Sequence, residues 1–92
     1  MKIGIIGGGA AGFMAAVAAK EGNPASEVTV LEKSHKLLAK VKVSGGGRCN
    51  VTNAIESPSL FAKQYPRGEK QLKKAFGQFF QKDIIEWFRT HG

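Results

Sequence analysis

Glycines near the N-terminus have the type and spacing needed to hold a phosphate group. The sequence GGGAAG at residues 7–12 fits the pattern G-x-G-x-x-G. In that pattern Gly7 permits a tight turn, Gly9 lets the backbone approach a pyrophosphate, and Gly12 lets a helix pack close against a strand. The start of the helix would offer its amides and partial positive charge to the phosphates.

An acidic residue follows at the distance that such a site needs. Glu32 lies about twenty residues after Gly12, at the end of a predicted strand. A carboxylate there can accept hydrogen bonds from a ribose diol and would repel a 2′-phosphate. The glycines alone are weak evidence, because glycine clusters often only make turns. The strand, the helix and the acidic residue in this order predict dinucleotide binding.

A second polar group, SGGGRCNVTN, occupies residues 44–53. Its glycines could bring bare backbone against a flat or anionic group, and Arg48 supplies a fork of donors. The residues suited to phosphate or ring-edge contacts are Ser44, Gly45, Gly46, Gly47, Arg48, Asn50, Thr52 and Asn53. The alternative is a flexible surface loop with incidental polar residues.

The remaining reactive side chains do not define a catalytic centre. Cys49 is the only cysteine, so it has no partner thiol, and no histidine lies nearby. We therefore expect it to be a small packed residue and not a nucleophile or a redox thiol. His35 lies in a basic, solvent-exposed loop and His91 at a fraying C-terminal end. We therefore assign no catalytic residue and, without a Cys/His cluster, no metal site.

The elements that would position these residues form a βαβ unit. β-branched residues predict a strand over Lys2–Ile6 and a second over Glu27–Glu32, and an alanine-rich, almost wholly apolar segment predicts a tightly packed helix over Ala10–Lys20. The fold class is therefore α/β, with parallel strands and a ligand crevice at their carboxyl ends. Two strands and one helix leave both sheet edges and one face uncovered, so we expect the opening part of a larger domain.

The rest of the chain is expected to be mostly loop and helix. Residues 33–53 read as a loop in which 41–43 could form an edge strand, and residues 57–68, with two prolines, read as a connection. Apolar spacing predicts a helix over 69–80 and a last helix beginning at Asp83, closed by a glycine at the C-terminus. The aromatic side chains expected in the core rather than on a stacking platform are Phe76, Phe79, Phe80, Trp87 and Phe88.

Composition narrows the class of protein. The chain has 92 residues and a formal net charge of +7, so it is one small basic domain or a piece of something larger. The uncharged run from residue 3 to 19 resembles a secretory signal, but glycines interrupt it and it is short for a membrane span. With a single cysteine, a cytoplasmic setting without membrane attachment is the simplest expectation.

The positive charge raises a nucleic-acid hypothesis. Five basic residues without an acid lie between Lys33 and Arg48, and five more surround Glu69. Such patches attract phosphates at long range. A solvated face that also neutralises one pyrophosphate explains them without RNA, and we favour this explanation because no RNA-reading motif is present.

Three segments together resemble a known family. GGGAAGFMAA, VTVLEKS and SGGGRCNVTN, in this order and spacing, resemble the N-terminus of bacterial NAD(P)/FAD-dependent oxidoreductases, the aminoacetone-oxidase-type flavoproteins related to a bile-acid dehydro-steroid reductase. Family members are several times longer, so the resemblance implies that this chain is roughly the first quarter. The remainder of its own polypeptide would then be its main partner, and FAD its cofactor.

The resemblance also implies roles for individual residues. The glycine loop would line the FAD pyrophosphate, Glu32 with Lys33 would hold the adenosine ribose, and residues 44–53 would run toward the flavin. The family usually has glycine and then a basic residue where this chain has Leu38 and Ala39, before Lys40. The implied cofactor-binding residues are Gly7, Gly9, Ala10, Ala11, Gly12, Glu32, Lys33, Lys40, Ser44, Gly45, Gly46, Gly47, Arg48, Cys49, Asn50, Thr52 and Asn53.

The function that follows is a Rossmann-like FAD-binding segment of a flavin-dependent oxidoreductase acting on a small molecule. FAD would carry the hydride chemistry, with NAD(P)H as an electron donor. The reaction is either reduction of a polarised C=C bond or oxidation of an amine by oxygen, and the segment alone is expected to be inactive. The alternative is a basic nucleic-acid-binding module or a flavoprotein that acts on RNA.

Overall fold

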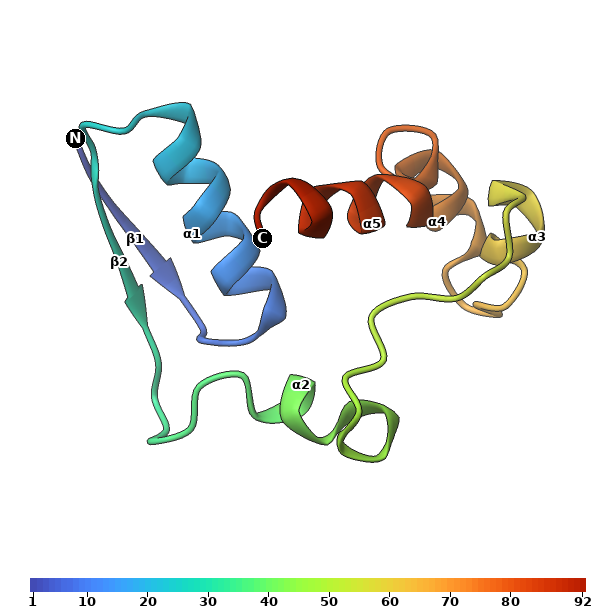
Figure 1. The fold of residues 1–92 in the computed structure, drawn as a ribbon, viewed down its shortest axis with the longest axis horizontal. Coiled ribbons are helices and arrows are strands. Elements are labelled where there is room, and N and C mark those ends of the chain that lie inside the picture. The colour runs from blue at the N-terminus through green and yellow to red at the C-terminus, as the bar shows by residue number, and fades with distance from the viewer. The chain divides into compact units, whose positions relative to one another are not determined.

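The computed structural model describes residues 1–92, which form two compact units, Met1–Asn50 and Val51–Gly92. The first unit contains β1 (Lys2–Ile6), α1 (Ala10–Gly22) and β2 (Glu27–Leu31) (Figure 1). None of the helices has the length and apolar character needed to cross a membrane.

The first unit is a βαβ unit, as the sequence predicts. β1 and β2 pair in parallel, with Lys2 opposite Glu27 and Ile6 opposite Leu31. The Gly7 amide donates to the Leu31 carbonyl at 2.7 Å, which continues the pairing beyond the end of β1. α1 runs two residues further than predicted, and β2 ends one residue earlier, so Glu32 follows the strand instead of closing it.

The sheet has one covered and one bare face. Ile3, Ile5 and their neighbours Val28 and Val30 are half-buried, and the residues between them are exposed. This alternation places one set of side chains against α1 and leaves the other uncovered, because successive side chains of a strand point to opposite faces. On the bare face Ile6 is 81% exposed and Leu31 is 52% exposed. The expectation of an uncovered face is confirmed.

Packing of α1 on all sides is not found. Phe13, Met14 and Val17 are half-buried, whereas Ala11 and Ala15 are exposed, and no residue of the helix is fully buried. The prediction was wrong because two strands offer the helix only one face to pack on. No large apolar side chain of α1 is exposed, because its exposed positions are alanines and, at its end, Lys20, Glu21 and Gly22.

A buried serine joins the end of α1 to the start of β2. Ser26 is 1% exposed, and its hydroxyl donates to the Asn23 carbonyl at 2.7 Å. The Lys20 ammonium donates to the Ser26 carbonyl at 2.8 Å. The Ser26 amide also donates to the Asn23 carbonyl, at 3.0 Å. Because all three polar groups of Ser26 have partners, its burial carries no unsatisfied hydrogen bond.

The segment after β2 contains a short helix at residues 41–43, where the sequence suggested an edge strand. α2 covers Ala39–Val43 and is followed by a 3₁₀ turn, η1, over Ser44–Gly47. The suggestion of an edge strand over residues 41–43 is therefore wrong. Three alternating residues are too few to set a period, and the sheet contains only β1 and β2.

The second unit consists of three helices, α3 (Pro58–Ala62), α4 (Glu69–Phe76) and α5 (Gln81–Thr90). α3 replaces part of the predicted connection, with the Ser57 hydroxyl accepting from the Leu60 amide at its start. The predicted helix over 69–80 ends four residues early.

Asp83 caps the last helix instead of beginning it. The Phe80 amide donates to the Asp83 carboxylate at 2.7 Å, and the Asp83 amide donates to the Phe80 carbonyl at 3.0 Å. This reciprocal arrangement satisfies amides that have no partner within the helix.

Phe61 is the centre of the second unit's core. It is buried together with Ala62 and Phe80, and its ring meets those of Phe76 and Phe80 edge to face at 5.0 and 5.5 Å between centroids. Phe79 and Phe88, two of the five predicted core aromatics, are about half exposed instead. Phe79 lies beyond the end of α4 at Phe76, so the helical spacing that placed it in the core does not apply, whereas Phe88 lies on an exposed side of α5.

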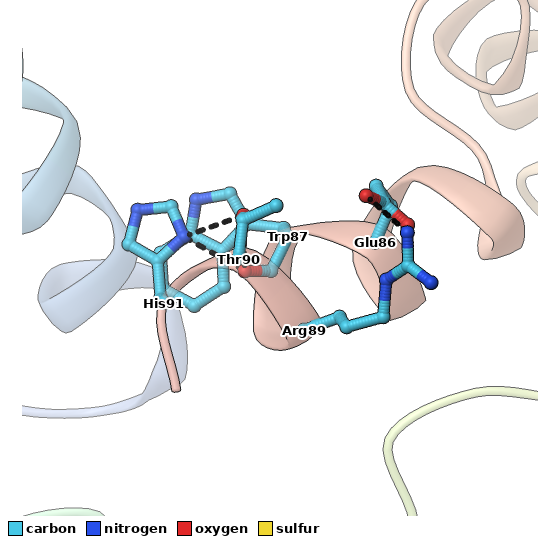
Figure 2. Close-up of polar contacts among 5 residues, drawn as sticks. All are labelled: Glu86, Trp87, Arg89, Thr90 and His91. Atoms are coloured by element: carbon cyan, nitrogen blue, oxygen red, sulfur yellow. Dashed lines mark hydrogen bonds and ion pairs between the residues drawn. The ribbon is translucent and has the colours of Figure 1, made fainter.

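The end of α5 is ordered by side chains (Figure 2). The rings of Trp87 and His91 stack at 4.1 Å, and His91 Nδ1 lies 2.7 Å from the Trp87 carbonyl oxygen. In the same helix, the Arg89 guanidinium pairs with the Glu86 carboxylate at 3.1 Å. His91 therefore has contacts within the last turn of α5, and the predicted fraying of this end stays a prediction. Gly92 follows at φ 86°, a conformation that suits a closing glycine.

Candidate nucleotide-binding site

The glycine loop joins β1 to α1 and leaves the helix N-terminus uncapped. Gly7 has φ 102°, which a residue with a side chain rarely adopts. Gly9 is extended, and its carbonyl accepts the first helical bond from the Phe13 amide at 3.0 Å. No side chain caps this end, and no acidic residue lies in the first turn of α1. The first amides of α1 are therefore suited to an anion.

Two positions in the loop depend on the absence of a side chain. A Cβ on Gly12 would fall on the carbonyl oxygen of Gly7, so helix and loop approach as closely as backbones can. A Cβ on Gly9 would meet nothing within 4 Å, which leaves open space on that side of the backbone. Close packing at Gly12 agrees with the predicted geometry, although the limiting atom belongs to the loop rather than to the strand.

Glu32 lies against the glycine loop. Its Oε2 accepts from the Gly8 amide at 2.7 Å and its Oε1 accepts from the Ser34 amide at 2.9 Å. Hydrogen bonds from the Ser34 amide and then from the Gly8 amide lower the pKa of the carboxyl group. A carboxylate has about four acceptor positions, so two remain for a ribose diol.

Gly8 is a residue that the motif leaves unspecified and that sequence reasoning missed. It is the one buried residue of the loop, and its carbonyl accepts from the Leu38 amide at 2.8 Å. A Cβ here would lie 2.6 Å from Leu37 Cδ2 and 3.1 Å from Glu32 Cβ. The pattern G-x-G-x-x-G gives no signal for this requirement, because the second position is free in it.

Residues 44–50 close on themselves through Ser44. The Ser44 hydroxyl donates to the Val41 carbonyl at 2.9 Å and accepts from the Asn50 amide at 3.2 Å, and the Ser44 carbonyl accepts from the Cys49 amide at 3.1 Å. The three glycines between them all have positive φ, from 58° to 88°. The segment is therefore a defined turn in which the Ser44 side chain serves the turn itself.

Cys49 and Arg48 lie on the outside of this turn. Cys49 is exposed and has φ 56°, so its predicted role as a packed residue is wrong. Every residue from 45 to 51 is exposed, so this turn offers no packed surroundings for a thiol. Arg48 is exposed as well.

The other predicted site residues are divided between the two units. Ala10 and Ala11 are exposed in the first turn of α1, and Lys33 and Lys40 are exposed near Glu32 in sequence. Thr52 and Asn53 belong to the second unit, where the Asn53 carboxamide accepts from the Ile55 amide at 3.1 Å. Their contact with a cofactor stays a prediction. No three His, Cys, Asp or Glu side chains come together as a metal site would need.

The parallel βαβ unit, the uncapped helix start and the carboxylate beside it define a Rossmann-type nucleotide-binding segment. Sequence comparison gives the family. The chain belongs to the HI0933-like protein Rossmann domain family, whose sequence model matches residues 1–92.

Curated relatives cover nearly the whole chain. It is 35% identical over 91 residues to the 3-dehydro-bile acid delta(4,6)-reductase of Clostridium scindens, covering 99% of this chain and 22% of that protein. It is 38% identical over 89 residues to the ribosomal RNA dihydrouridine synthase of Escherichia coli, covering 96% of this chain and 21% of that protein. It is 29% identical over 89 residues to the fumarate reductase flavoprotein subunit of Proteus vulgaris, covering 97% of this chain and 14% of that protein.

The chain spans about a fifth of the length of the first relatives it matches. No solved structure matches it. Family and relatives together identify a Rossmann segment of flavoprotein oxidoreductases.

Proposed function

We propose that this chain is the segment of a flavin-dependent reductase that binds the adenosine and pyrophosphate half of FAD. The observation that carries the proposal is the Glu32 carboxylate held against the Gly8 amide, beside an uncapped helix start. This arrangement places an acceptor for a ribose diol, which follows β2, next to the loop and helix start that offer donors for phosphates. Bound FAD would supply the hydride chemistry.

In this proposal, the residues of this chain bind the cofactor and orient it. The open backbone at Gly9 and the first amides of α1 would receive the pyrophosphate, and Glu32 would accept from the ribose hydroxyls. Ionised Glu32 would also repel a 2′-phosphate, which favours FAD or NAD over NADP at this position. Exposed Lys33 and Lys40 add positive charge to the same unit.

For the reaction, we favour reduction of a polarised C=C bond with NAD(P)H over oxidation of an amine. Two of the named relatives are reductases, of a 3-dehydro-bile acid and of fumarate. In the proposed reaction the alkene gains a hydride and a proton, and NAD(P)H is oxidised. The rest of the polypeptide would supply the flavin-ring contacts, the substrate pocket and the proton donor.

The test uses the full-length protein purified with added FAD. We expect visible flavin absorbance that anaerobic NADH or NADPH bleaches and that an electron-poor alkene restores. Restoration by oxygen after bleaching with a primary amine would select amine oxidation instead. A protein without flavin absorbance after FAD addition would refute the proposed function.

Ribosomal RNA is a second candidate substrate. Two relatives, from Escherichia coli and Haemophilus influenzae, are named ribosomal RNA dihydrouridine synthases, and each is 38% identical to this chain. Ten basic residues that could attract phosphates are exposed. They are Lys33, Lys36, Lys40, Lys42, Arg48, Lys63, Arg67, Lys70, Lys73 and Lys74.

The RNA candidate predicts salt-sensitive binding of the full-length protein to ribosomal RNA fragments. It also predicts that dihydrouridine forms in the bound RNA when NAD(P)H is added. Absence of binding at low salt would contradict it and leave the small-molecule reductase.

A further inference from the structure

Gly8 is held from two sides by the segment that follows β2. Its amide donates to Glu32 Oε2 at 2.7 Å, and its carbonyl accepts from the Leu38 amide at 2.8 Å. Both peptide groups that flank the Gly8 Cα therefore bond to residues of one short segment. Gly8 is buried, whereas Gly7 is half-buried and Gly9 is exposed.

The space around Gly8 has no room for a side chain. A Cβ would lie 2.6 Å from Leu37 Cδ2, 3.1 Å from Glu32 Cβ and 3.2 Å from Glu32 Oε2. Leu37 lies on one side of this position and Glu32 on the other, so a Cβ could move away from Leu37 only by pressing closer to Glu32. With Leu37 in place, a side chain at position 8 would therefore displace the Glu32 carboxylate, and truncating Leu37 would give the Cβ room to move away from Glu32.

The segment that holds Gly8 is itself shaped for that contact. Leu38 has φ 54°, a left-handed conformation that disfavours a leucine, and its amide is the donor to Gly8. The Ser34 amide, four residues earlier, holds the second oxygen of Glu32 at 2.9 Å. A strained residue that persists at a contact of this kind is maintained by the surrounding bonds.

We propose that Glu32, Leu37 and Leu38 form a clamp on Gly8 that fixes the glycine loop and the Glu32 carboxylate relative to each other. Gly8 is then a positioning residue, which acts through Glu32 by setting the separation between the pyrophosphate donors and the ribose acceptor. The link to FAD rests on the proposed function, whereas the clamp itself is a property of the protein without cofactor.

The experiment compares four full-length proteins: the unchanged sequence, Gly8→Ala, Gly8→Ala/Leu37→Ala and Gly22→Ala. Gly22 is the control, because a Cβ there meets nothing within 4 Å and it lies at the far end of α1. The first measurement is hydrogen exchange of the glycine-loop amides in FAD-free protein. We expect Gly8→Ala to speed exchange in the loop, and Gly22→Ala to leave it unchanged.

The second measurement is the dissociation constant for FAD, followed by quenching of flavin fluorescence. Gly8→Ala should raise it about tenfold, the order expected when a hydrogen bond to a charged group is lost. Removing the nearest obstacle in Gly8→Ala/Leu37→Ala should restore most of that affinity. A merely destabilised protein would not regain affinity from a second truncation.

The two measurements separate the two proposals. If the loop amides exchange slowly in the unchanged protein and quickly in Gly8→Ala, but the protein binds no FAD, the clamp is supported and the proposed function is refuted. FAD binding and loop exchange that are both unchanged in Gly8→Ala refute the clamp and leave the proposed function intact. Loss of affinity that Leu37→Ala does not restore also refutes the clamp.

Discussion

Gly12→Ala gives the sharpest test of the loop geometry, because helix propensity and packing predict opposite signs. In a helix, alanine is favoured over glycine by about 1 kcal/mol. At Gly12 the added Cβ would fall on the Gly7 carbonyl oxygen, a backbone atom that cannot rotate away. Overpacking typically costs about 1–3 kcal/mol, and a backbone obstacle belongs at the upper end of that range. After the gain in propensity, we expect a net loss of about 2 kcal/mol.

The assay compares thermal unfolding of the full-length protein with that of Gly12→Ala and Gly22→Ala. Both substitutions are made in α1, but a Cβ on Gly22 meets nothing within 4 Å. We therefore expect the midpoint to fall for Gly12→Ala and to stay level or rise for Gly22→Ala. Equal or higher stability of Gly12→Ala would show that helix and loop are not in backbone contact, and would refute the packing argument.

Three further predictions follow from Glu32 and from the second core. Glu32→Ala should raise the FAD dissociation constant about tenfold or more, as measured by fluorescence quenching, because it removes the acceptor for a ribose and for Gly8; unchanged affinity would remove Glu32 from the site. Since the folded-state pKa of Glu32 is lowered, its stabilising hydrogen bonds are fully present above the ordinary pKa of 4.5 and are lost as the pH falls from there through the lower folded-state pKa; an acid titration of FAD affinity should show this loss, and Glu32→Gln should flatten it. Phe61→Ala should destabilise the second unit by about 3–5 kcal/mol, whereas exposed Phe79→Ala should change stability by about 0.5 kcal/mol or less in chemical unfolding; similar losses in both variants would contradict the assigned core.

The βαβ unit could be predicted because its signals are local. β-branched residues in β1 and β2, a run of alanines and a glycine cluster each specify one element. Contacts between elements could not be predicted in the same way. Gly8 is free in the motif, and only the approach of Leu37 and Leu38 makes a side chain there costly.

The segments after β2 were harder to predict, because prolines and short runs of alternating apolar residues occur in more than one kind of secondary structure. Pro58 suggested a connection, yet it occupies the first turn of α3, where its missing amide costs nothing. That misreading concealed Phe61, which the structure places at the centre of the core. The alternation of Val41 and Val43 similarly suggested a strand. A strand there would need a neighbouring strand to pair with, and the structure has a helix instead.

The departure at Leu38 was visible in the sequence, but its meaning was not. The resemblance to the flavoprotein oxidoreductases implies a glycine at this position, and the structure gives Leu38 φ 54°, a conformation that glycine adopts without strain. The backbone angles of Leu38 therefore give a physical reason for a glycine at this position, and these angles could not be read from the sequence.

The bare face of the sheet determines how the protein can be handled. Ile6 and Leu31 are paired across the two strands and are 81% and 52% exposed, so they form one contiguous apolar spot at the carboxyl end of the sheet. Two open strand edges flank it. We expect exposed strand edges with apolar side chains beside them to favour self-association. Polar replacements at Ile6 and Leu31 should therefore improve the solubility of any preparation in which these two side chains stay exposed.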